Sequence, residues 1–270
     1  MSRYLFQRSE KVIELRENIN FLGCPVSRLS IPQTLEWIAD AVRSGKPRQI
    51  SVVNANKYHL MSRDHHLYDI IINSDLVIPE WAVVWGARQL KLPALPHSGG
   101  ILLSRQLLPF AAQRKMRLYF LGAKPEVVSR LAQKVGNEYP GLEIAGYHHG
   151  YLSTLAVEAQ TIEEIRQSKP DVLLVGFGSP RQEKWIAANK DFLNVPVSIG
   201  VGGSFDVLSG DKPDTPNWAR GRGLEWLYRI MQDPRAYTKR YLVTNIWFVW
   251  RVFREKNARI FSRNKYSKID

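Results

Sequence analysis

Short apolar runs alternate with amphipathic stretches over most of this chain of 270 residues. The runs are continuous and rich in β-branched residues, which is typical of strands that are covered by helices on both faces. One of them leads directly into residues 125–138, where apolar side chains recur at helical spacing. Strand–helix–strand units of this kind predict an α/β protein with a mostly parallel sheet flanked by helices. The expected strands are residues 50–54, 75–79, 117–122, 171–175 and 195–201.

A proline-containing segment, residues 210–216, separates this body from the end of the chain. We therefore expect two parts, a body of residues 1–216 and a C-terminal segment of residues 217–270. The C-terminal segment is predicted to be helical, with a break at Pro234 because proline interrupts a helix interior. The helices expected there are residues 217–231 and 235–261.

The positive charge is concentrated in the C-terminal segment. The formal net charge is +13, and residues 218–270 hold 13 basic and 4 acidic side chains, which gives +9 of that total. The same residues hold 11 of the 29 aromatic side chains. Basic charge with tryptophan suits a helix at an anionic membrane surface. A helix whose aromatic face packs on the body explains the aromatic residues equally well, so both alternatives stay open at this point.

No stretch of the chain has the marks of a spanning segment or of a secretory signal. The longest uncharged stretch of the tail, residues 241–250, is shorter than the roughly 20 residues needed to cross a bilayer. The first thirty residues are charged throughout. The single cysteine, Cys24, excludes a disulfide framework and is expected to be buried and inert. These features predict a cytoplasmic location.

The sequence contains no motif that is typical of a metal site or a cofactor site. His65-His66 and His148-His149 are adjacent pairs whose side chains diverge, and no carboxylate stands at ligand spacing from them. The sequence has no Asp-x-Asp, Walker or His-Glu-x-x-His motif. We therefore expect neither a metal nor a bound cofactor.

Polar residues follow two of the expected strands. Asn54 and Asn56 come at the end of the first, and Glu80 follows the second. Ligands bind beyond the carboxyl ends of strands in open α/β sheets, so the asparagines are candidate ligand contacts. Glu80 is a candidate general base. The alternatives are a turn that favours asparagine and a solvated loop glutamate.

A glycine turn and a helix start follow the strand at residues 171–175. Gly178 would let a ligand approach the backbone, and Ser179, Pro180 and Gln182 predict a capping box with proline in the first turn. Such a helix start can bind a phosphate. The alternative is a well-capped helix without a ligand. The pattern lacks the third glycine of a dinucleotide fingerprint.

These pieces occur together in a known family, in the same order along the chain. The blocks are Asn54-Ala55-Asn56, Asp75-Leu76-Val77-Ile78-Pro79-Glu80, Phe120-Leu121-Gly122, Gly176-Phe177-Gly178-Ser179-Pro180-Arg181-Gln182-Glu183-Lys184-Trp185, Gly202-Gly203-Ser204-Phe205-Asp206-Val207 and Gly223-Leu224-Glu225-Trp226-Leu227-Tyr228-Arg229. From about residue 19 to residue 241 the sequence resembles the WecG/TagA/CpsF glycosyltransferases, glycosyltransferase family 26.

The resemblance implies a metal-independent, inverting enzyme that moves a sugar from a UDP-sugar to a polyprenyl-diphosphate-linked saccharide. It implies cell-surface polysaccharide assembly at the cytoplasmic face of the membrane. It also implies a Rossmann-like sheet and a C-terminal appendage that binds the membrane surface and helps to close the site. A homo-oligomer is compatible with the resemblance.

Site residues carry over by position in the family's motifs. Glu80 stands where the family has its catalytic aspartate. Substrate-binding positions correspond to Asn54, Asn56, Gly178, Gln182 and Arg229, and more loosely to Arg235 and Arg240.

This sequence departs from the family pattern at several places. Asn54 replaces threonine, Glu80-Trp81 replaces Asp-Gly, residues 97–101 lack an acidic residue, and residues 214–216 reverse a charge. These departures are expected to alter the choice of donor or acceptor rather than the reaction, so glucose, an N-acetylhexosamine and a uronate are all open as donors. Two other classes remain as alternatives, a basic nucleic-acid-binding protein and a dinucleotide-dependent oxidoreductase.

Overall fold

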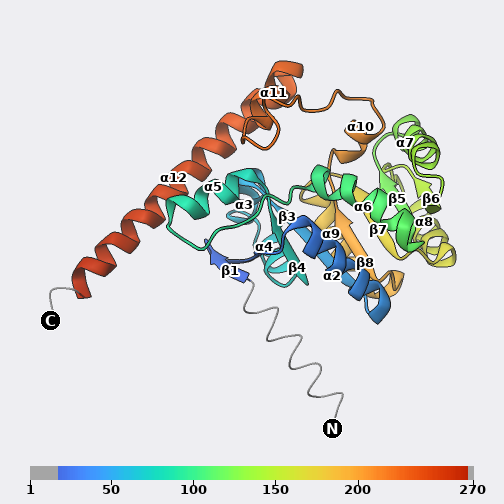
Figure 1. Ribbon diagram of the computed structural model, residues 1–270, viewed down its shortest axis with the longest axis horizontal. Helices are drawn as coiled ribbons and strands as arrows, with labels where there is room; N and C mark the ends of the chain where they lie inside the picture. The colour runs from blue at the N-terminus through green and yellow to red at the C-terminus, as the bar shows by residue number, and fades with distance from the viewer. Residues whose placement is uncertain (1–17, 267–270) are drawn as a thin grey trace, which may run out of the picture.

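The computed structural model describes residues 18–266 and contains a six-stranded parallel sheet (Figure 1). The order of its strands is β4-β3-β8-β7-β5-β6, and every neighbouring pair is parallel. The strands are β3 (Arg48–Val53), β4 (Leu76–Pro79), β5 (Arg117–Gly122), β6 (Glu143–His148), β7 (Val172–Gly176) and β8 (Val197–Gly200). The predicted α/β class with a parallel sheet is confirmed.

Helices cover both faces of the sheet. In β5, Leu118 and Phe120 join one core cluster, whereas Tyr119 and Leu121 join another, because successive strand side chains point to opposite faces. The first cluster includes side chains of α2 (Ile31–Ser44), α6 (Gly100–Arg114), α7 (Pro125–Glu138) and α10 (Ser204–Leu208). The opposite face is covered by α3 (Ala55–Met61), α4 (His65–Ile72), α5 (Trp81–Gln89), α8 (Leu155–Ser168) and α9 (Arg181–Leu193). Burial on both faces explains the continuous apolar runs.

Three strands were not predicted. β6 lies at the edge of the sheet, and its sequence EIAGYH is only partly buried, so it lacks an apolar run. β1 (Asn18–Phe21) and β2 (Cys24–Ser27) form a separate antiparallel hairpin. Cys24 is fully buried there, and burial raises the pKa of its thiol to about 12. The prediction of a buried, inert cysteine is therefore supported by the structure.

The C-terminal segment forms α11 (Glu225–Gln232) and the 33-residue α12 (Pro234–Tyr266). The prediction of a helix from residue 217 was wrong over residues 217–224, which form turns in which Gly221 and Gly223 adopt positive φ. The predicted break next to Pro234 is confirmed, because α11 ends before Asp233. Within residues 18–266, no helix is long and apolar enough to cross a membrane.

One side of α12 packs on the body. It contacts α3 and α5 and extends past them (Figure 1). Phe248 and Val252 are buried, and the ring of Phe248 lies 6.0 Å from that of Phe21 and 5.7 Å from that of Tyr58. Packing on the body thus explains part of the aromatic content of the tail. A second, exposed apolar side remains.

Candidate active site

Asn54 and Glu80 meet at the carboxyl edge of the sheet. β3 and β4 are parallel neighbours with Val53 opposite Pro79, so the residues that follow them are brought side by side. Asn54 Nδ2 donates a hydrogen bond of 2.9 Å to Glu80 Oε2. Asn54 Oδ1 in turn accepts one of 2.9 Å from the backbone N–H of Lys57 and caps α3. Asn54 is therefore both a helix cap and a partner of the candidate base.

Asn56 is placed less centrally. It lies in the first turn of α3 and is half-buried. Asn56 lies near the carboxyl end of β3, which is the edge of the sheet where a ligand is predicted to bind. A contact between Asn56 and substrate stays a prediction.

The loop after β7 is tied to the loop after β8 by Gln182. Its Oε1 accepts hydrogen bonds from the backbone N–H groups of Gly178 at 3.1 Å and Gly202 at 3.0 Å. Gly178 has φ +78°, which glycine adopts without strain. Gln182 is buried, so its observed contacts shape the loop. A direct contact of Gly178 or Gln182 with substrate stays a prediction.

The predicted capping box at this helix was wrong. The N-cap of α9 is Pro180, and the Gln182 side chain bonds to Gly178 instead of to the backbone of Ser179. The Ser179 hydroxyl donates to Glu183 Oε1 at 3.2 Å. The Ser179–Pro180 peptide bond is cis, a conformation that the sequence pattern does not specify.

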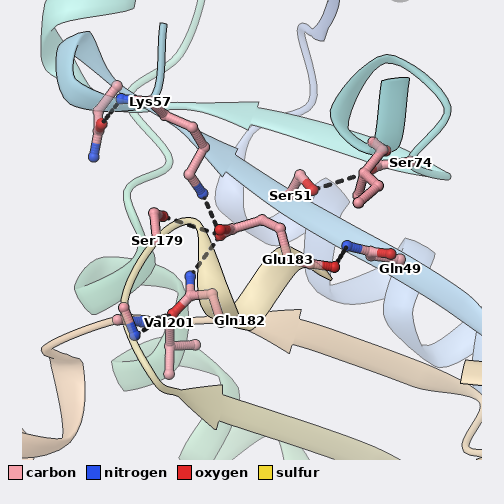
Figure 2. Close-up of polar contacts among 12 residues, drawn as sticks. Gln49, Ser51, Lys57, Ser74, Ser179, Gln182, Glu183 and Val201 are labelled. Carbon is pink, nitrogen blue, oxygen red and sulfur yellow. Dashed lines mark hydrogen bonds and ion pairs between the residues drawn. The ribbon is translucent and has the colours of Figure 1, made fainter. Parts of the chain in front are cut away.

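A buried ion pair lies beneath these two loops (Figure 2). Lys57 Nζ donates to Glu183 Oε1 at 2.7 Å, and both side chains are no more than 3% exposed. Gln182 Nε2 also donates to Glu183 Oε1, at 2.7 Å. Burial raises the pKa of the Glu183 carboxyl, but the charge and hydrogen bonds of Lys57, Gln182 and Ser179 outweigh it and hold that pKa below its usual range. The pair joins the α3 start, which carries Asn54, to the loop that carries Gly178.

Sequence reasoning missed this pair. Lys57 and Glu183 are far apart along the chain and belong to different strand ends, and neither was singled out. No local pattern indicates that Lys57 is buried, because Asn56 precedes it and Tyr58 and His59 follow it, and a buried lysine is explained only by its partner.

Two predicted arginines of the tail, Arg229 and Arg240, act together with Glu80 on the phenol of Tyr241. The pKa of the Tyr241 phenol is raised, first by burial and then by the charge of Glu80, while the charges of Arg240 and Arg229 act in the opposite direction. The Arg240 guanidinium lies 4.8 Å from the centroid of the Tyr241 ring. Glu80, Arg229 and Arg240 therefore all act on one phenol, and their contact with substrate stays a prediction. Arg235 lies exposed at the start of α12 and is not among the charges that act on this phenol.

The segment before α11 is held to both parts of the chain. Lys212 Nζ donates to Asp206 Oδ2 at 2.8 Å and to the Tyr237 hydroxyl at 3.2 Å. Asp214 pairs with Arg105 of α6 at 2.6 Å and also with Arg220. The acidic residue at position 214 therefore binds the segment to the body.

Metal independence stays a prediction. Over the described part of the chain, residues 18–266, no group of three or more histidine, cysteine, aspartate or glutamate side chains could hold a metal ion. His148 Nδ1 instead lies 2.8 Å from the carbonyl oxygen of His149.

Comparison with known proteins identifies the family of this chain. The model of the glycosyl transferase WecG/TagA/CpsF family matches residues 19–261, from the β1–β2 hairpin into α12. The chain belongs to this family. The resemblance noted in the sequence is confirmed, and membership favours glycosyl transfer over the nucleic-acid-binding and oxidoreductase alternatives.

Two relatives in the family illustrate its range of organisms. A Bacillus subtilis (strain 168) protein is 32% identical over 213 residues, which are 78% of this chain and 82% of the relative. A Staphylococcus aureus (strain MW2) protein is 31% identical over 228 residues, 82% of this chain and 88% of the relative. Each is an N-acetylglucosaminyldiphosphoundecaprenol N-acetyl-beta-D-mannosaminyltransferase.

Proposed function

We propose that this chain transfers a hexosyl group from a UDP-sugar to a saccharide on a polyprenyl diphosphate, with inversion and without a metal. The observation that carries the proposal is the Glu80 carboxylate, which accepts a hydrogen bond from Asn54 at the carboxyl edge of the sheet. Its charge acts on the same Tyr241 phenol as the charges of Arg229 and Arg240. The names of the relatives specify an acceptor on diphosphoundecaprenol, which supports a lipid-linked acceptor here. Polysaccharide assembly at the cell surface, such as exopolysaccharide synthesis, is the proposed role.

Glu80 is the proposed base. Asn54 binds Oε2, and the other oxygen, Oε1, lies toward Gly99. In the transfer, the proton of the acceptor hydroxyl goes to the Glu80 carboxylate. The hydroxyl oxygen forms its bond to the anomeric carbon as the bond from that carbon to the phosphate oxygen breaks. UDP leaves with that electron pair, and attack from the opposite face inverts the configuration.

The leaving diphosphate requires positive charge. The charges of Arg229 and Arg240 act on the same Tyr241 phenol as that of Glu80, and arginine can bind a phosphate through two parallel hydrogen bonds. Donors fixed in place before the reaction stabilise charge that develops in the transition state. The tail therefore completes the site in this proposal.

The proposal is tested with a panel of UDP-sugars. We expect thermal stabilisation of the full chain by UDP and by at least one of UDP-glucose, a UDP-N-acetylhexosamine and a UDP-uronate. We then expect UDP release only when a synthetic prenyl-diphospho-sugar is added. Stabilisation by a nicotinamide dinucleotide, or salt-sensitive retention on DNA without any effect of UDP, would contradict the proposal.

We also propose that α12 binds the inner, cytoplasmic face of the membrane as a peripheral helix. Its exposed side carries apolar residues at helical spacing, and two cations lie over aromatic rings there, Arg254 over Trp250 and Lys256 over Phe253. Aromatic rings at the headgroup level with cations on lipid phosphate are what an interfacial helix uses. The exposed apolar side consists of Leu242, Val243, Ile246, Val249, Trp250 and Phe253.

Replacing both Ile246 and Trp250 by aspartate is expected to abolish sedimentation with vesicles of phosphatidylglycerol and phosphatidylcholine. Both side chains are more than half exposed, so the fold should keep the wild-type melting temperature. Leu155→Asp, at the exposed start of α8, is the matched control and should sediment as wild type. Unchanged sedimentation of the double variant would refute the membrane-binding side of α12.

A further inference from the structure

The segment that precedes α6 lies directly beside the candidate base. The backbone N–H of Ser98 donates to the carbonyl of Pro79 at 3.0 Å, so residues 97–99 run alongside the end of β4. The Ser98 hydroxyl donates to the carbonyl of Leu29 at 3.4 Å. Ser98 and Gly99 are buried. The position of His97 is therefore set by the same strand end that presents Glu80.

His97 and Glu80 approach one point from two sides. A Cβ at Gly99 would lie 3.2 Å from His97 Nε2 and 3.6 Å from Glu80 Oε1. Since Asn54 already holds Oε2, the oxygen that faces the imidazole is the one left for the acceptor. A Cβ at position 99 would be tight against His97 and in ordinary contact with Glu80 Oε1, so both groups lie close to Gly99.

Trp81 holds the imidazole in place. The ring centroids of Trp81 and His97 are 6.2 Å apart at an interplanar angle of 34°. Trp81 is fixed in turn by Arg88, whose guanidinium lies 5.4 Å from its ring, and by Gly223. A Cβ at Gly223 would be only 2.4 Å from Trp81 Nε1, so the turn before α11 lies directly against the indole. The imidazole thus lies near the Trp81 ring and near Gly99, which Glu80 also approaches.

We infer that His97 is a second contact for the acceptor hydroxyl in the proposed glycosyl transfer, and the inference rests on that proposed function. A hydroxyl has one hydrogen to donate and two lone pairs. With the hydrogen directed to Glu80 Oε1, a hydrogen bond from His97 Nε2–H to one lone pair directs the other toward the anomeric carbon. Correct orientation of the attacking atom is a large part of catalysis by bound groups.

Two substitutions distinguish the role of the His97 nitrogen from the role of its ring. His97→Phe keeps a ring against Trp81 and removes the nitrogen, whereas His97→Gln places an amide N–H near the position of Nε2 and removes the ring. We expect His97→Phe to lower kcat/KM for the acceptor by about tenfold to hundredfold, the usual effect of one hydrogen bond at a reacting centre. His97→Gln should recover most of that loss. KM for the UDP-sugar and the melting temperature should match wild type in both.

His65→Phe, an exposed histidine at the start of α4, should leave every parameter unchanged. Wild-type kcat/KM in His97→Phe, or a loss in His97→Gln that equals or exceeds the loss in His97→Phe, would overturn the inference and assign the ring to packing alone. Absence of UDP release from the wild-type chain with every donor and acceptor would instead overturn the proposed function, and the inference with it.

Discussion

Glu80→Gln is expected to lower the rate of UDP release by about 10²–10⁴-fold, the usual contribution of a general base. The amide has nearly the shape of the carboxylate and can still accept the hydrogen bond from Asn54 Nδ2, but it cannot take a proton. Binding should survive, so stabilisation by UDP should stay within about a factor of two of wild type. The measurements are steady-state UDP release and the melting temperature with and without UDP.

Two further variants calibrate this prediction. Glu126→Gln, on the exposed first turn of α7, should leave turnover unchanged. Glu80→Asp keeps the carboxylate but withdraws it by one methylene, so we expect intermediate turnover. Near-wild-type turnover of Glu80→Gln would remove Glu80 from the role of base.

Glu183→Gln is expected to lower the free energy of unfolding by about 3–5 kcal/mol, because it leaves the Lys57 ammonium buried without its counter-charge. Lys57→Met should lower it by a similar amount for the converse reason. The double variant Lys57→Met/Glu183→Gln leaves no uncompensated charge, so it should recover most of the loss. Denaturant unfolding of the three variants measures these effects.

An exposed pair provides the control for this series. Lys134 and Glu138 lie one helix turn apart at 3.8 Å, and both are exposed, so Glu138→Gln should change the free energy of unfolding by less than about 0.5 kcal/mol. A loss of that small size for Glu183→Gln would contradict the buried ion pair.

The lowered pKa of Glu183 also sets how the free energy of unfolding depends on pH. Because the pKa of Glu183 is lower in the folded protein than the ordinary value of 4.5, the contribution of the ion pair to stability is present above about pH 4.5 and is lost as pH falls below it.

Local patterns predicted the elements of the sheet that are buried on both faces. The strand at residues 117–122 and the helix at residues 125–138 have the predicted bounds. A short apolar run that ends at a glycine suits a buried strand, and apolar side chains at helical spacing suit an amphipathic helix. β6 was not predicted because an edge strand buries little apolar surface and needs no apolar run. The start of α11 was placed too early because Gly221 and Gly223 adopt positive φ in the preceding turns.

The candidate site was partly predictable. Asn54 and Glu80 were identified because each follows a predicted strand, and the carboxyl ends of parallel strands lie at one edge of a sheet. The loop at residues 176–182 was also located, but its capping box was wrong: the Gln182 amide bonds to two glycine N–H groups, one of them after β8. A local motif cannot specify a partner that comes from another strand.

The sequence by itself determined the α/β class, the position of the candidate base, the basic aromatic tail and membership of the family, because each depends on residue types at short spacing. The tertiary structure decided which distant groups meet. It placed Lys57 against Glu183, Tyr241 near Glu80 and His97 beside Trp81. The reason is physical, since strand order and helix packing are set by burial over the whole chain and no local pattern contains them.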